Sequence, residues 1–267
     1  MKIEQAKEIA ETAIGQLAES LERGQSEGLK DYLAAMARFP RYSLHNILLI
    51  MAQRPGATRV AGYRTWNSLG RKVHRGAKGI LILAPIVRRR ETEPSEVSVP
   101  SSVKLVGFCG VYVFAEEDTS GQPLPQLSRC QGDPFDYTNR LKAFIASRGI
   151  QFHYSEGLRP AYGQCSADRI ELLPDLDPAM EFAVLAHEVG HLLFHFDSRR
   201  TETTKCVRET EAEAVAFVVC QAIDLEAIRS ASEYILLYSG DKDGLTESLE
   251  HVQRASTEII TAITAPG

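Results

Sequence analysis

The stretch Ala183–His195 reads AVLAHEVGHLLFH and places two histidines four residues apart within an apolar run. On an α-helix, side chains four apart project from the same face, so His187 and His191 are expected one turn apart. That spacing suits two nitrogen ligands of a tetrahedral zinc ion, and Glu188 beside them can take a proton from a metal-activated water. The stretch therefore predicts a helix that carries a zinc site.

A plainer interpretation of the same helix is a buried one whose histidines are hydrogen-bonded core residues. The residues around the motif, such as Val184, Leu185 and Val189, make the helix apolar nearly all round. Polar and charged groups are costly to bury unless they have a partner. A metal ion is the simplest partner for two histidines and a glutamate in one turn, and we therefore favour the metal site.

The third protein ligand must come from outside the motif. His195 lies one further turn beyond His191, but three consecutive turns of one straight helix cannot surround a tetrahedral ion. His153 and His251 are isolated histidines, which are more typical of surface or core positions.

A better source is the next apolar helix, expected at about residues 207–223. Glu209 and Glu213 share one face of it with small alanines, whereas Glu211 points nearly the opposite way. We predict Glu209 as the third ligand, with Glu211 and Glu213 as the alternatives. With Glu209 as the ligand, Glu213 is expected to accept the second N–H of a ligand imidazole. The alternative is an acidic first turn that the helix dipole alone would favour.

Two histidines and one glutamate leave one position of a tetrahedral zinc ion (Zn²⁺) open for water. Glu188 would then act as the general base and pass its proton to the leaving amine during peptide-bond hydrolysis. The motif thus predicts a zinc-dependent metalloendopeptidase whose protein substrate the sequence does not identify. A non-catalytic protein with a structural zinc ion is the alternative.

The first half of the chain has an unusual charge pattern. Between Tyr32 and Arg90 there are twelve basic residues and neither Asp nor Glu, although the whole chain carries a net charge of −5. Such asymmetry indicates a surface for nucleic acid, and single strands need a cationic track with aromatic faces for stacking. The residues predicted to contact nucleic acid are Arg59, Tyr63, Arg64, Trp66, Arg71, Lys72, Arg75 and Lys78. For Trp66 a core position is the alternative, because a lone tryptophan is usually largely buried.

Local patterns predict an α+β fold. Helices are expected at 1–22, 29–38, 44–53, 137–147, 207–223 and 244–263, besides the motif helix after Asp177 and Pro178. Strands are expected at 80–87, 103–114 and 150–154 and in a hairpin of 161–165 with 169–173. The polar, proline-containing segment 116–134 suggests a domain boundary.

The chain shows no sign of export or membrane insertion. Its first residues, MKIEQA, lack the apolar core of a signal peptide, and no apolar run is long enough to span a bilayer. The five cysteines form no CxxC pair and indicate free thiols. We therefore expect a cytoplasmic protein without a membrane partner.

Two families resemble parts of this sequence. The motif His187–His195, followed by Glu209 and Ala212, resembles the zinc-peptidase domain of ImmA/IrrE-type proteins. The segments 42–50 (YSLHNILLI), 60–66 (VAGYRTW) and 70–79 (GRKVHRGAKG) resemble the N-terminal domain of ArdC-type antirestriction proteins. One departure is Glu213, where ImmA/IrrE-type proteins usually carry Asn.

The ArdC resemblance implies two domains in this order. The first, at residues 1–120, would be a small α+β domain that binds single-stranded DNA, and the second, at 121–267, a zincin-like metallopeptidase domain with the HExxH helix. The resemblance also implies that DNA protection is separable from proteolysis, so the two activities are separate expectations.

Overall fold

The structure is a computed structural model of the chain, and it divides into two compact units. One unit comprises residues 1–13 and 48–124, and the other comprises 14–47 and 125–267. Residues 14–47 thus pack with the C-terminal unit, although they lie inside the segment 1–120 that the sequence predicts as one domain. The described residues are 3–89, 103–124, 134–196, 199–225 and 241–265.

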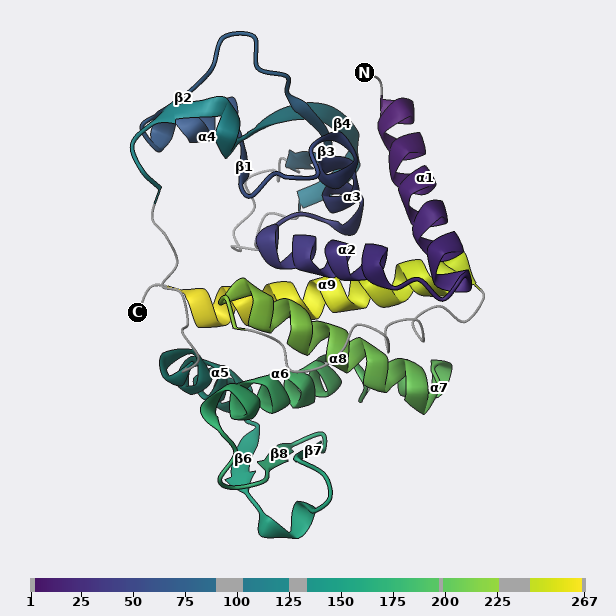
Figure 1. Cartoon of the computed structure of the whole chain (residues 1–267), viewed down its shortest axis with the longest axis vertical. Coiled ribbons are helices and arrows are strands. Elements are labelled where there is room, and N and C mark those ends of the chain that lie inside the picture. Colours follow the sequence, from purple (N-terminus) through teal and green to yellow (C-terminus); the bar gives the residue numbers. More distant parts are fainter. Residues whose placement is uncertain (1–2, 90–102, 125–133, 197–198, 226–240, 266–267) are drawn as a thin grey trace, which may run out of the picture. The chain divides into compact units, whose positions relative to one another are not determined.

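The fold is mixed α+β (Figure 1). Its described α-helices are α1 (Ile3–Glu22), α2 (Glu27–Arg38), α3 (Leu44–Gln53), α4 (Tyr63–Ser68), α5 (Phe135–Ser147), α6 (Pro178–Phe194), α7 (Arg199–Glu202), α8 (Lys205–Ala222) and α9 (Lys242–Thr264). Its described strands are β1 (Val60–Gly62), β2 (Arg71–Val73), β3 (Ile80–Arg89), β4 (Val103–Ala115), β5 (Thr119–Gly121), β6 (Gln151–Tyr154), β7 (Gly163–Cys165) and β8 (Arg169–Leu172). Single 3₁₀ turns lie at η1 (Glu116–Asp118) and η2 (Glu156–Leu158). None of the described helices is long and apolar enough to cross a membrane.

The first unit is built on an antiparallel sheet in the order β1-β4-β3, in which β3 and β4 form a long two-stranded ribbon. Its core joins Ala6 and Ala10 of α1 to Leu49 of α3 and Leu81 of β3. The Gln53 side-chain amide accepts from the Leu81 N–H (3.0 Å) and donates to the Leu81 carbonyl (2.9 Å), which satisfies the edge of β3 at that point. Most of the segment between the predicted strands 80–87 and 103–114 lies outside the described residues.

The second unit places a small sheet beside a helical layer. The sheet has the order β6-β8-β7, with β6 and β8 parallel and β7 and β8 antiparallel. Helix α6 packs on β7 and β8 and also on α5, α8 and α9. In Figure 1, α8 lies between α9 and α6, and the sheet lies on the other side of α6.

Local sequence explains where the two central helices begin. Asp177 caps α6 by accepting the N–H of Met180 at 3.0 Å, and Pro178 occupies the first helical position, where no N–H is needed. Thr204 caps α8 in the same way, accepting from the Val207 N–H at 3.3 Å. The two helices approach closely at Gly190 of α6, where a Cβ atom would lie 3.3 Å from the Cα of Ala212.

Candidate metal centre and nucleic-acid surface

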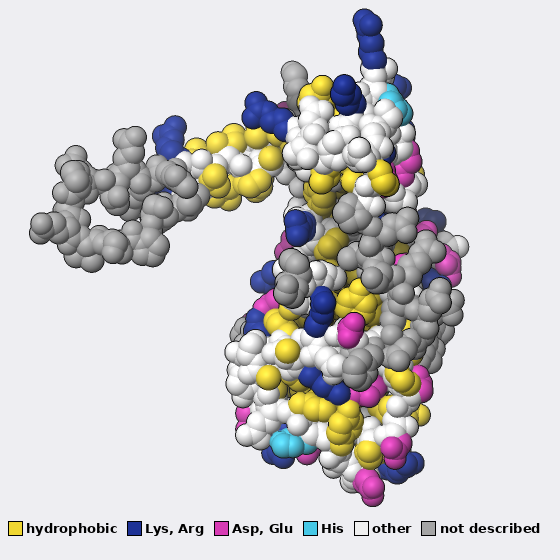
Figure 2. Space-filling view, turned by 90° about the vertical axis from the view of Figure 1, so that its left-hand side faces the viewer, with side chains coloured by type: hydrophobic (Ala, Val, Ile, Leu, Met, Phe, Trp, Pro, Cys, Tyr) yellow, Lys and Arg dark blue, Asp and Glu magenta, His cyan; other side chains and the backbone are white. Residues whose placement is uncertain are grey.

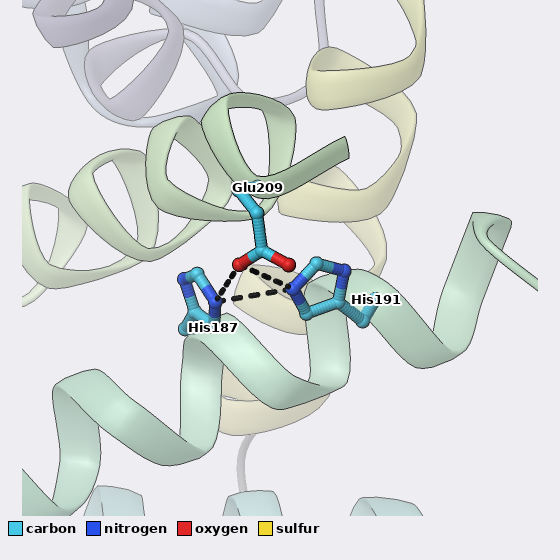
Figure 3. Close-up of side chains that lie close together, drawn as sticks. All are labelled: His187, His191 and Glu209. Atoms are coloured by element: carbon cyan, nitrogen blue, oxygen red, sulfur yellow. Dashed lines mark hydrogen bonds and ion pairs between the residues drawn. The ribbon is translucent and has the colours of Figure 1, made fainter. Parts of the chain in front are cut away.

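Three side chains from α6 and α8 converge on one point in the second unit. The Nε2 atoms of His187 and His191 lie 3.1 Å apart, and Oε2 of Glu209 lies 3.6 Å and 3.4 Å from them (Figure 3). One ligand atom from each of the three residues lies within 4.8 Å of the others. The structure thus brings together the two histidines of the motif and the carboxylate expected from the following helix.

The spacing of these atoms fits a metal ion. With metal–ligand bonds of about 2.0–2.1 Å and tetrahedral angles, neighbouring ligand atoms are separated by about 3.3 Å. The observed separations of 3.1, 3.4 and 3.6 Å scatter around that value. Two imidazole nitrogens and a carboxylate oxygen are also a donor set found in zinc sites. The residues present therefore fit a divalent metal ion.

The remaining ring nitrogen of each histidine also has a partner. Nδ1 of His187 lies 3.3 Å from Oε2 of Glu213, the position that the sequence predicts for that carboxylate. Nδ1 of His191 lies 2.7 Å from Nδ1 of His195, and Nε2 of His195 lies 2.9 Å from Oε2 of Glu211. Neither His195 nor Glu211 belongs to the group of three, but both are buried directly behind it.

The acids around the site govern the protonation of its histidines. Burial by itself lowers the pKa of His187, but hydrogen bonds with Glu209 and Glu213 and nearby negative charge raise it to about 9. The same hydrogen bonds from His187 and His191 hold the pKa of Glu209 well below its usual range. Without a metal ion the site therefore favours an imidazolium–carboxylate pair, and a metal cation would replace the bound proton.

Glu188 lies beside the three converging side chains in a cavity of about 340 Å³. Burial raises the pKa of its carboxyl group, although the charges of His187 and His191 oppose that rise. Gly163 of β7 makes room for it, because a Cβ atom there would lie 2.7 Å from Oε1 of Glu188. The cavity is lined by the converging His187 and Glu209, by Glu188 and Glu213, and by a mainly apolar remainder: Pro160, Ala161, Tyr162, Gly163, Met180, Ala183, Val184, Ala216, Phe217 and Cys220.

In the first unit, three of the residues predicted to contact nucleic acid have structural roles. Trp66 is 1% exposed and its indole N–H donates to the Phe114 carbonyl at 2.9 Å, so the core alternative holds and its ring is not available for stacking. The Arg71 guanidinium donates to the Thr119 hydroxyl and to the Gln122 carbonyl. Arg59 lies 3.9 Å from Glu116.

The other five predicted residues are exposed. They are Tyr63, Arg64, Lys72, Arg75 and Lys78. Val113 of β4 pairs with Ile80 on one side and with Gly62 on the other. This brings Lys78, just before Ile80, and Tyr63 and Arg64, just after Gly62, into one region.

A second tyrosine lies in that region. Tyr112 is 49% exposed, and a Cβ atom on Gly79 would lie 2.9 Å from its ring. Its ring thus packs against the end of the basic segment 71–79, called the basic loop below, beside Lys78. Tyr63 is 56% exposed and directly follows Gly62, whose partner on β4 is Val113. The backbone of Tyr63 therefore lies next to that of Tyr112. The sequence did not predict a role for Tyr112, because its contact with Gly79 depends on the register of β4 against β3.

The ribbon of β3 and β4 continues beyond this region with apolar side chains exposed. Figure 2 shows apolar side chains along it and basic side chains near its end. The large apolar residues that are about half exposed there are Ile86, Val87, Leu105, Val106 and Phe108, and the exposed basic residues are Arg88 and Lys104.

Residues 4–117 match the family model of the N-terminal domain of anti-restriction factor ArdC. These residues form an ArdC-type N-terminal domain. Nearly the whole chain also resembles two crystal structures of the antirestriction ArdC protein from the R388 plasmid. The metal-free one matches with a TM-score of 0.52 and 18% identity over 96% of this chain and 97% of that one. The Mn(II)-bound one matches with a TM-score of 0.51 and 19% identity over 97% and 99%. At these identities the likeness shows a shared fold.

An uncharacterized protein of Bacillus anthracis is also similar, with 18% identity over 260 residues. The match covers 82% of this chain but only 44% of that relative. The chain therefore spans less than half the length of this curated relative, and the relative's further part has no counterpart in the match.

Proposed function

We propose that this chain is an antirestriction protein that binds single-stranded DNA through its first unit and holds a divalent metal ion in its second. The match of residues 4–117 to the ArdC N-terminal domain supports the antirestriction role. The main observation in favour of DNA binding is that the exposed Tyr63 and Tyr112 lie close to the basic loop, which contains Lys78. Aromatic faces beside cations suit an unpaired strand, since every base offers a face for stacking.

The comparison of single-stranded and duplex DNA tests this function. We would measure fluorescence anisotropy of a labelled oligonucleotide, alone and annealed to its complement, with the wild type and with Tyr63→Ala and Tyr112→Ala. Loss of one stacked base costs about 1–3 kcal/mol, which is about a 5- to 150-fold rise in Kd for the single strand. Tyr154→Ala, at an exposed tyrosine of the other unit, is the matched control. Equal binding of both DNA forms, or unchanged binding by both tyrosine variants, would refute the proposal.

For the metal, His187, His191 and Glu209 would be the protein ligands. The geometry of these three supports a divalent ion, and one of the similar ArdC structures is a Mn(II)-bound one. Zinc remains our first choice because two imidazoles and one carboxylate form a typical zinc ligand set. A bound ion would supply Lewis-acid polarisation and lower the pKa of a water molecule.

A second candidate function is hydrolysis of a peptide bond in the cavity. It is favoured by the position of Glu188, whose carboxylate shares the cavity with His187 and Glu209 and whose pKa is raised by burial. A carboxylate in that state is suited to take up a proton from water and return it to a leaving amine. Loss of cleavage of a general protein substrate in Glu188→Gln, with metal content retained, would support this candidate. Cleavage that survives the substitution would remove it.

A further inference from the structure

A chain of buried polar side chains runs from the metal site into the interior of the second unit. His191 contacts His195 (Nδ1 to Nδ1, 2.7 Å), His195 contacts Glu211 (2.9 Å), and the Arg199 guanidinium donates to both oxygens of the Glu211 carboxylate. His195, Arg199 and Glu211 are 2%, 4% and 0% exposed. The chain therefore connects one candidate ligand to a sealed ion pair.

The hydrogens in this chain have one consistent arrangement. When Nε2 of His191 binds a metal ion, the ring proton of His191 lies on Nδ1 and donates to Nδ1 of His195. His195 then carries its own proton on Nε2 and donates it to Glu211. Glu211 is an acceptor only, and Arg199 donates to both of its oxygens. In this arrangement, each contact between the four side chains joins one donor to one acceptor.

Arg199 anchors the far end of the chain in a third helix. Its guanidinium also donates to Oε1 of Glu247 (2.9 Å) and to the hydroxyl of Ser248 (3.2 Å), both on α9. Because each member is held by its neighbours, the orientation of the His191 ring is fixed from α7, α8 and α9 together. Such outer partners orient metal ligands and raise their basicity.

We propose that His195, backed by Glu211 and Arg199, is a positioning residue that fixes the tautomer and orientation of His191 for metal binding. This inference rests on the metal centre proposed above, but not on DNA binding or proteolysis. His195 itself donates nothing to the ion, so its effect is on affinity and not on the number of ions bound.

Two substitutions separate this role from a merely structural one. The Oδ1 of Asn can take the place of Nδ1 of histidine, so His195→Asn keeps an acceptor for His191 but does not reach Glu211. The longer Gln reaches Glu211 with a donor, so His195→Gln keeps the buried ion pair satisfied but offers His191 no acceptor. We would measure the Kd for Zn(II) and for Mn(II) by competition with a chromogenic chelator, and the Tm of the metal-free proteins.

The proposal expects a rise in Kd on the order of 10- to 100-fold for His195→Gln, with a Tm close to that of the wild type. It expects a lower Tm for His195→Asn, with a Kd close to that of the wild type. If the variant with the lower Tm is also the one with the higher Kd, the positioning role is wrong. It is also wrong if His195→Gln binds metal as tightly as the wild type does. Should His195→Gln fail to fold, His195→Asn still tests the proposal, because a large rise in its Kd with the acceptor for His191 kept would contradict the positioning role. A wild type that binds neither ion would overturn the metal centre itself.

Discussion

Neutralising the basic loop of the first unit gives the most quantitative prediction for DNA binding. Lys72, Arg75 and Lys78 are exposed, and the perturbation is their joint replacement by Gln. Each phosphate contact with single-stranded DNA contributes about 0.7 to the slope of log Kd against log salt concentration. Three lost contacts therefore lower that slope by about 2 and weaken binding by about 100-fold at 0.1 M salt.

The assay is a salt series of anisotropy titrations with one labelled single strand. A control variant removes the same charge from exposed positions of the other unit, by Lys30→Gln, Arg159→Gln and Lys205→Gln. Only general net-charge effects should appear in this control. If the loop variant keeps the slope of the wild type, or loses no more affinity than the control, the loop does not contact the DNA backbone and the reasoning fails.

Three further predictions concern single residues. Trp66→Phe removes the donor to the Phe114 carbonyl and should lower the free energy of unfolding by about 1–3 kcal/mol. DNA binding by the folded fraction should persist. A loss of DNA binding without a loss of stability would contradict the core position of Trp66. Metal affinity should rise about tenfold per pH unit between about pH 6.5 and 9, because the pKa of His187 is raised to about 9 in the metal-free site and the metal must displace that proton. In the metal-free protein the protonated His187 ring contributes stability that is fully present below about pH 6.5 and is lost as pH rises through about 9. A Tm that stays constant over this pH range would count against the imidazolium–carboxylate pair of His187. Gly163→Ala places a Cβ atom 2.7 Å from Oε1 of Glu188 and should cost about 1–3 kcal/mol of stability by overpacking, with metal binding retained; unchanged stability would show that the cavity wall yields.

The convergence of His187, His191 and Glu209 could be predicted because it follows from helical spacing within two short segments. His187 and His191 face one way on α6, and among the three acids of α8 only Glu209 and Glu213 share a face. The chain of buried partners could not be predicted in this way. Glu211 lies apart from the three converging side chains and contacts His195 of α6 and Arg199 of α7, a tertiary arrangement that local helical spacing does not fix.

The basic surface was only partly predictable, because long-range pairing decides which cations are exposed. Arg54 donates to Asp118 at 2.6 Å and Arg59 lies near Glu116, and both acids follow the acid-free stretch in the sequence but fold back onto it. Tyr112 joins the basic loop through the register of β3 and β4, which local patterns do not fix.

Metal content gives the most direct test of the centre on α6 and α8. The wild type, incubated with Zn(II) or Mn(II) and desalted, should retain one ion per chain by elemental analysis, whereas His187→Ala and Glu209→Ala should retain none and still bind single-stranded DNA. Equal retention by the wild type and both variants would place any bound ion elsewhere and contradict the metal centre.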